Sequence, residues 1–254
     1  MEVLKYLYTA KLLLRKHIVL RYNRTYLGLF WAILNPLFSL SVMVLVFSTI
    51  FGSDPKEFAL FLFSGIIPWF LFSSVVTSCS GVLYENEGLI KKIYLPKIIF
   101  PFSTSITVLI DSFLLLISLI ILSIILNGNL TTALLFVPIS YLLLLLFSIG
   151  IGLTCSILAT KYRDMMHIVP IILQAGFFLS PVIYDESRIN NNLLNFIFEI
   201  NPLTSYIKLF REPLYVGVIP ETSSILYSVL LSSILFIGGL IFFQRNYKKI
   251  VYIL

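Results

Sequence analysis

The sequence is poor in charge, cysteine and histidine, and each shortage excludes a class of protein. Charged residues make up 12% of the 254 residues, whereas hydrophobic residues make up 59%. A soluble domain carries about 25% charged residues, so a chain of this composition could not cover its surface in water. The two cysteines and two histidines have no metal-ligand or redox spacing. Soluble enzymes, disordered proteins and disulfide-stapled secreted domains are therefore excluded, and the chain is predicted to be an integral membrane protein.

A nucleotide-binding motif is also missing. The chain has no G-x-x-x-x-G-K-[ST] phosphate loop, so it cannot hydrolyse ATP by that chemistry. Its excess of 18 Lys and Arg over 12 acidic residues concerns membrane topology and lipid head groups before nucleic acid. We expect no catalytic residue, no metal site and no cofactor in this chain, and no nucleic-acid partner.

Six apolar stretches are candidates for membrane spans. A helix needs about 20 apolar residues to cross the hydrocarbon core. The fifth stretch is short, and the mixed region 185–224 behind it contains three prolines between apolar patches, with Pro181 just before it. Because helix-breaking residues at membrane depth must be surrounded by protein or line a cavity, we interpret this region as short re-entrant or outer-interface helices. The stretches are about 31–52, 58–83, 99–126, 132–159, 167–184 and 225–243.

The basic residues indicate how the spans are oriented. Fourteen Lys and Arg fall on the side of the N-terminus and four on the other side, which predicts two cytoplasmic termini. Over residues 2–16 most basic side chains share one face of a helix. This pattern favours an amphipathic interface helix, with a plain topogenic charge cluster as the alternative. The predicted fold is one all-α membrane domain over 1–254, divided into 1–30 (interface helix), 31–183 (spans one to five), 184–224 (outer gate region), 225–243 (span six) and 244–254 (cytoplasmic tail).

Four motifs follow one another in a recognisable order. They are RYNRTYLGLFWAILNP at 21–36, NEGLIKKIYLPKIIFP at 86–101, YRD at 162–164, and the pair SPVIY at 180–184 and NPLTSYIKLFREPL at 201–214. Together they resemble type-2 ABC transporter permeases of the bacterial polysaccharide export kind, such as the membrane subunit of O-antigen exporters (Wzm-like). The resemblance covers nearly the whole chain.

The resemblance implies the membrane subunit of an ABC exporter that moves lipid-linked, O-antigen-like polysaccharide across the bacterial inner membrane. It also implies a homodimer of permeases with two copies of a separate ATPase subunit, which would bind ATP and Mg. A type-2 exporter of teichoic acid, capsule, lipid or drug shares this architecture and stays open. A membrane enzyme acting on a polyprenyl lipid is a remote alternative, because it would need clustered acids around a metal-bound pyrophosphate and the acids here are scattered.

Two sets of candidate site residues follow. The segment after the second span places acidic before basic residues, which suits a short helix that contacts an ATPase; an ordinary solvated loop is the alternative. Aromatic rings in the spans nearest the pathway could stack on sugar faces, with lipid-facing packing as the alternative. The coupling set is Glu85, Asn86, Glu87, Gly88, Leu89, Lys91 and Lys92, and the pathway set is Phe30, Trp31, Phe38, Trp69, Phe70, Phe72, Phe177, Phe178 and Tyr184.

Three further ionisable residues stand out. Arg21 and Arg24, just before the first span, could form charge-assisted hydrogen bonds to the pyrophosphate of a lipid-linked substrate. Binding of lipid phosphates and simple topology signalling are the alternatives. Asp111 is the one acid well inside a predicted span, and such a group is costly there. We favour a structural role for it, because a proton relay would need a second membrane carboxylate.

Overall fold

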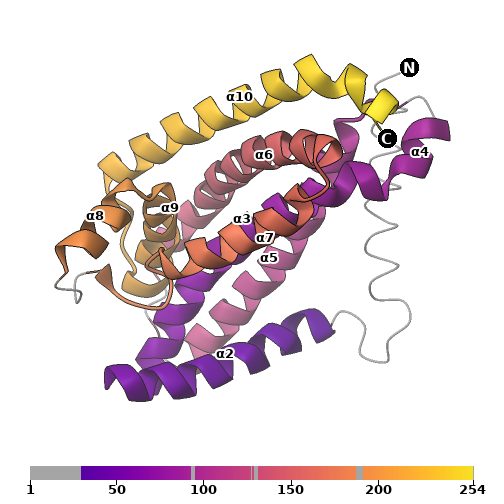
Figure 1. The fold of residues 1–254 in the computed structure, drawn as a ribbon. Helices are drawn as coiled ribbons and strands as arrows, with labels where there is room; N and C mark the ends of the chain where they lie inside the picture. Colours follow the sequence, from indigo (N-terminus) through magenta and orange to yellow (C-terminus); the bar gives the residue numbers. More distant parts are fainter. Residues whose placement is uncertain (1–29, 93–94, 127, 129–130, 187–190, 254) are drawn as a thin grey trace.

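A computed structural model describes residues 30–92, 95–126, 128, 131–186 and 191–253. Within these ranges every regular element is helical, and Figure 1 shows their arrangement. Residues 1–29 of the predicted interface helix over 1–30, including Arg21 and Arg24, lie outside the described residues, and Phe30 begins α2. The helices are α2 (Phe30–Phe51), α3 (Pro55–Glu85), α4 (Glu87–Lys92), α5 (Ile99–Ile125), η1 (Thr132–Phe136), α6 (Val137–Lys161), α7 (Met165–Phe178), α8 (Asn192–Ile200), α9 (Pro202–Arg211), η3 (Glu212–Val216) and α10 (Thr222–Ile253).

The helix lengths confirm an all-α membrane protein with about six spans. Five described helices are long and apolar enough to cross a membrane, and α7 is a shorter apolar helix. With 14 residues, α7 is about 21 Å long, less than the roughly 30 Å of a hydrocarbon core. The span predicted over 167–184 is therefore shorter than expected. Its helix ends at Phe178, because Pro181 lacks the N–H that the next turn would need.

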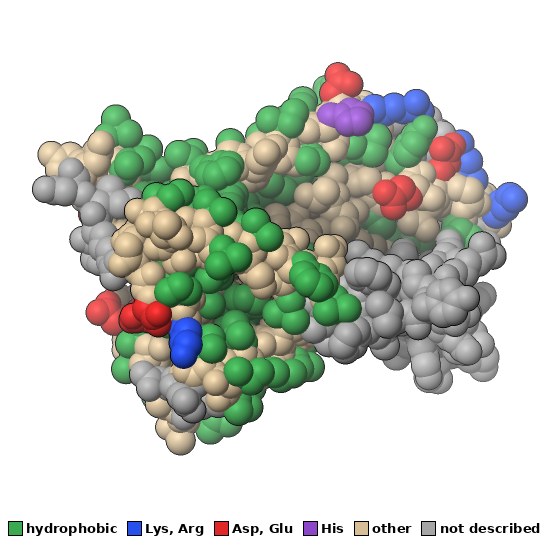
Figure 2. Space-filling view, turned by 90° about the horizontal axis from the view of Figure 1, so that it is seen from below, with side chains coloured by type: hydrophobic (Ala, Val, Ile, Leu, Met, Phe, Trp, Pro, Cys, Tyr) green, Lys and Arg blue, Asp and Glu red, His purple; other side chains and the backbone are tan. Residues whose placement is uncertain are grey.

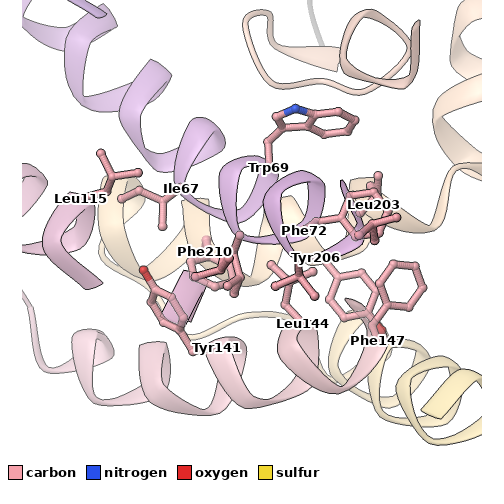
Figure 3. Packing of buried hydrophobic residues seen from close by; sticks show 14 of the residues in the cluster. Ile67, Trp69, Phe72, Leu115, Tyr141, Leu144, Phe147, Leu203, Tyr206 and Phe210 are labelled. Atoms are coloured by element: carbon pink, nitrogen blue, oxygen red, sulfur yellow. The ribbon is translucent and has the colours of Figure 1, made fainter. Parts of the chain in front are cut away.

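Helix α3 is the central element of the bundle. Its 31 residues contact α2, α5, α6, α7 and α9, and Pro68 lies inside it. Figure 3 shows Trp69 on one side of α3, while Tyr141, Leu144 and Phe147 of α6 lie on the other. The Phe72 ring lies between the two sides, 5.5 Å from that of Phe147 and 5.9 Å from that of Trp69. One face of α3 therefore forms the core, and the opposite face is left for other contacts.

Close backbone contact fixes α6 between two neighbours. A Cβ added to Gly239 of α10 would lie 2.9 Å from Gly150 Cα of α6, and one added to Gly152 would lie 2.9 Å from Cys79 Cβ of α3. Small residues let membrane helices approach this closely, which maximises dispersion contact where the hydrophobic effect offers no preference. Helices α3, α6 and α10 accordingly share the most extensive contacts in the described structure.

The region between α7 and α10 forms the short helices that its sequence predicts. Asn191 and Asn201 cap α8 and α9, with their side chains accepting hydrogen bonds from the first backbone N–H groups. Helix α9 is not peripheral, because the Tyr206 and Phe210 side chains are fully buried. The Tyr206 hydroxyl lies 2.5 Å from Ser232 Oγ of α10. The outer gate region is thus anchored in the core by α9.

Candidate translocation groove

A hydroxyl-lined groove runs between α3 and α5, with a volume of about 610 Å³. Serine and threonine dominate its walls, and two acids, Asp111 and Glu85, belong to it. Figure 2 shows a hollow between hydrophobic side chains, and most of the atoms exposed in it belong to the backbone or to side chains that are neither hydrophobic nor charged. The lining residues are Phe70, Ser73, Ser74, Thr77, Ser78 and Glu85 of α3, and Thr104, Thr107, Val108 and Asp111 of α5.

The groove follows from the helical repeat of these two segments. On α3 the lining positions 70, 73, 74, 77 and 78 fall on one face, as spacings of three and four residues do. Ser73 Oγ donates to Trp69 O at 2.8 Å, and Thr107 Oγ1 donates to Ser103 O at 3.0 Å. Each of these hydroxyls keeps acceptor lone pairs. Such a polar face is unfavourable against lipid, so we expect it to face water, substrate or another subunit.

A second groove, of about 340 Å³, continues around α3 toward α7 and shares Ser73 and Thr77 with the first. Its other walls are largely aromatic. Trp69 meets Phe177 of α7 edge-on at 5.4 Å between ring centroids, and Phe178 continues the contact at 5.4 Å from Phe177. Gln174 adds an amide to the same wall. Together the two grooves present hydroxyl groups flanked by rings along most of one face of α3.

The end of α3 carries a short helix turned away from the bundle. Asn86 Nδ2 donates to Val82 O at 2.8 Å, which closes the last turn of α3, and Ile90 is buried. Helix α4 then exposes Gly88 and Lys92. Lys91 and Glu87 form an ion pair at 2.5 Å along it. The helix is thus fixed on one side and presents charged groups on the other.

The loop between α6 and α7 contacts the same end of α3. The Arg163 guanidinium lies 4.7 Å from the centroid of the Tyr84 ring, a cation–π contact. Nearby, Lys97 Nζ donates to Tyr247 O of α10 at 2.8 Å, and partial burial lowers the pKa of Lys97. The last turns of α3 and α10 and the α6–α7 loop therefore lie at one end of the molecule (Figure 1), and the hydroxyl groove reaches that end at Glu85.

Comparison with known proteins identifies the family. Residues 8–215 match the sequence profile described as ABC-2 type transporter. The chain belongs to this family, as its motifs predict. It is 25% identical to the O-antigen export system permease protein RfbA of Myxococcus xanthus over 88% of this chain and 86% of that protein. It is 29% identical to the polysialic acid transport protein KpsM of Escherichia coli over 94% and 93%, and 29% identical to RfbA of Klebsiella pneumoniae over 91% and 88%.

The predicted pathway aromatics of this ABC-2 transporter fall into three places. Trp69, Phe177 and Phe178 line the groove toward α7, and Phe70 lines the hydroxyl groove. Phe72 is 6% exposed in the core, where its ring lies 5.9 Å from that of Trp69, and it does not line either groove. The side chains of the remaining candidates lie elsewhere: Phe38 is exposed on α2, Tyr184 lines a separate pocket, and Phe30 and Trp31 are outside the side chains described.

The predicted coupling residues also lie in two places, on α4 and at the end of α3. Glu87, Gly88, Lys91 and Lys92 are on α4, where Leu89 packs against the core. Glu85 instead lines the hydroxyl groove, and Asn86 is buried as a cap. The structure thus places Glu87, Lys91 and Lys92 on α4, leaves Glu85 exposed at the end of α3 and buries Asn86.

Sequence reasoning missed the hydroxyl groups that line the larger groove. Their signal is present in the sequence, since Ser73 and Ser74 recur as Thr77 and Ser78 four residues later in an otherwise apolar span. Four-residue spacing places both pairs on one helical face. Asp111 belongs to the same surface on α5, one helix away. Its sequence neighbour Ser112 instead has its hydroxyl 3.1 Å from that of Tyr141 in the core.

Proposed function

We propose that this ABC-2 transporter subunit exports a lipid-linked polysaccharide, an O-antigen-like glycan, across the bacterial inner membrane. The observation that carries the proposal is the hydroxyl-lined face of α3 and α5, continued by the rings of Trp69, Phe177 and Phe178. Relatives that match most of the chain are named as permeases for O-antigen export and as polysialic acid transport proteins. These names support a glycan as the cargo.

A sugar chain matches the chemistry of these walls. Its hydroxyl groups can donate to and accept from serine and threonine side chains, while its C–H faces can pack on aromatic rings. Individual hydroxyl contacts are weak in net terms, about 0.5–1.5 kcal/mol each, so a chain can slide from one to the next. A drug or lipid tail would leave the hydroxyls of Ser74 and Ser78 facing apolar atoms, at a cost in desolvation.

The chain would act as a homodimer with two copies of an ATP-binding subunit, which would hold ATP and Mg. The 14 basic residues of the predicted inner side support two cytoplasmic termini. On that orientation α4 faces the cytoplasm, with Glu87, Lys91 and Lys92 available to the ATPase. Arg21 and Arg24 would then lie at the inner head-group level, where they could hold the pyrophosphate of the substrate.

Substitutions in the groove test this function directly. Ser74→Leu and Thr77→Leu are expected to abolish surface display of the glycan while leaving membrane insertion unchanged, because they replace hydroxyls along the groove with bulk. Ser233→Leu is the matched control, since Ser233 is exposed on α10 away from both grooves. Surface glycan is measured by antibody or lectin binding to whole cells, and insertion by protease protection. Normal display in both groove variants would contradict the proposal.

Coupling is tested by replacing 84–97 with a neutral linker. We expect a complex that inserts and retains basal ATP hydrolysis but no longer exports glycan. Copurification of the ATPase in mild detergent measures whether the partner still binds. Full export by this variant would assign coupling to another surface.

A further inference from the structure

A third cavity lies at the end of the bundle opposite α4. It has a volume of about 210 Å³, enough for one sugar ring rather than a chain. The end of α2, the start of α3, the segment behind α7 and the residue Tyr215 enclose it. We call this cavity the Tyr215 pocket. Its principal lining residues are Phe51, Glu57, Phe58, Phe61, Tyr184 and Tyr215.

Rings in contact form most of the pocket. Phe51 and Phe58 lie 5.9 Å apart between centroids, Phe58 and Phe61 6.1 Å apart, and Phe61 meets Tyr215 edge-on at 5.6 Å. The polar group at the opening is a carboxylate, because Tyr215 Oη donates to Glu57 Oε1 at 3.0 Å and Glu57 is exposed. Rings beside an oriented carboxylate match a molecule with apolar faces and hydroxyl edges, and a small set of placed polar groups gives such a pocket its specificity.

The charge of the pocket limits which sugars it can bind. The charged side chains among its described lining residues are both acids, Glu57 and Asp185. Arg211 lies behind the Phe61 ring at 3.9 Å from its centroid, and its Nη2 donates to Val182 O at 2.9 Å. Arg211 therefore stabilises the wall and does not line the cavity. A sugar bearing a carboxylate would be placed beside like charges, which repel at this range.

We propose that the Tyr215 pocket binds a single uncharged sugar ring of the exported glycan at the outer end of its path. The ring stacks on the exposed face of Phe51 and donates a hydroxyl hydrogen bond to Glu57. This inference rests on the proposed function, because it takes the cargo to be a glycan. It adds a site and a substrate preference: neutral sugars in place of chains such as polysialic acid, which carry a carboxylate on every unit.

Photocrosslinking in glycan-producing cells that contain the complete transporter tests the site. A benzophenone amino acid replaces Phe51 in the pocket, Phe70 in the hydroxyl groove, or Tyr227, an exposed α10 residue that serves as the control. We expect glycan adducts at positions 51 and 70 and none at 227. Adducts at 70 alone would overturn the pocket and leave the proposed function intact. Absence at both 51 and 70 would overturn both, and an adduct at 227 equal to that at 51 would remove the claim of a specific site.

Two measurements on the adduct test the recognition chemistry. Glu57→Leu in the position-51 background is expected to lower the adduct yield about ten-fold, as loss of one hydrogen bond to a charged acceptor would. Lys56→Leu, on the exposed neighbour of Glu57, is the matched control and is expected to leave the yield unchanged. The trapped sugar is then released and identified by mass spectrometry. A neutral sugar supports the assignment, whereas a sugar carboxylate as the main product, or an unchanged yield in Glu57→Leu, overturns it.

Discussion

The contact between α6 and α10 gives a sharp test of packing, because two adjacent glycines of α10 have opposite surroundings. A Cβ at Gly239 would lie 2.9 Å from Gly150 Cα, whereas a Cβ at Gly238 would meet nothing within 4 Å. Carbon atoms pack best about 3.5–4.0 Å apart, so Gly239→Ala must separate the helices by about 0.6 Å or more. Gly238→Ala requires no movement.

The two substitutions are expected to change the free energy of unfolding in opposite directions. Overpacking of this kind costs about 1–3 kcal/mol, and alanine in place of glycine at an open helical site gains about 0.5–1 kcal/mol. The two variants should therefore differ by about 1.5–4 kcal/mol, with Gly239→Ala the less stable. For a chain of this size that difference corresponds to about 3–16 °C in Tm.

Thermal unfolding of the purified chain in mild detergent, followed by fluorescence-detected size exclusion, measures the difference. Both variants carry the same chemical change on neighbouring residues, so expression and detergent effects cancel in the comparison. A Tm for Gly239→Ala equal to or above that of Gly238→Ala would refute the close approach of α6 and α10. Gly150→Ala is expected to resemble Gly239→Ala, since its Cβ would lie 2.7 Å from Phe236 N.

Three further predictions concern side chains at the two ends of the bundle. Asn201→Asp keeps the α9 cap but loses the amide donation to Ser180 Oγ at 2.8 Å, so it should cost about 1 kcal/mol in chemical unfolding, with Asn201→Ala costing about 1 kcal/mol more. Arg163→Ala should cost only about 0.5–1 kcal/mol in stability, yet lower glycan export if its contact with Tyr84 transmits movement; equal export would show that it does not. Lys208→Ala removes an ion pair with Glu186 at 2.5 Å; a loss above about 1 kcal/mol, or one insensitive to salt, would contradict its being a surface pair.

The helices and their order could be predicted from the sequence, because long apolar runs have one stable form in a membrane. The length and apolar composition of α3, α5, α6 and α10 are enough to predict each of them as a membrane span, without any knowledge of their contacts. The limits of α7 were less predictable. The apolar residues beyond Phe178 extend the run to Tyr184, but hydropathy does not register the turn that the backbone makes there.

The candidate site depended on facts that hydropathy cannot supply. Trp69 lines a groove and Phe72 does not, although their rings lie only 5.9 Å apart. This difference depends on where α6 and α7 pack against α3, and the two residues look alike in the sequence. Arg211 is a further case: burial lowers its pKa to about 10, which still leaves it charged at neutral pH. Gly65 makes room for it, since a Cβ there would lie 2.6 Å from Arg211 Nη2. Neither residue carries a local signal of that contact.

Helix α3 also has the geometry of a lever. It carries the Tyr215 pocket at its first turn, the grooves along its middle and α4 at its last turn, with Pro68 between. Because Pro68 cannot donate to the carbonyl of Ser64, the helix is weakest there. From this pivot the arms measure about 20 Å to Pro55 and about 25 Å to Glu85, at 1.5 Å per residue. A tilt of about 5° would move the α4 end by about 2 Å and the pocket end by slightly less in the opposite direction. Helix α3 thus joins the surface that we propose for the ATPase to the pocket that we propose for the sugar.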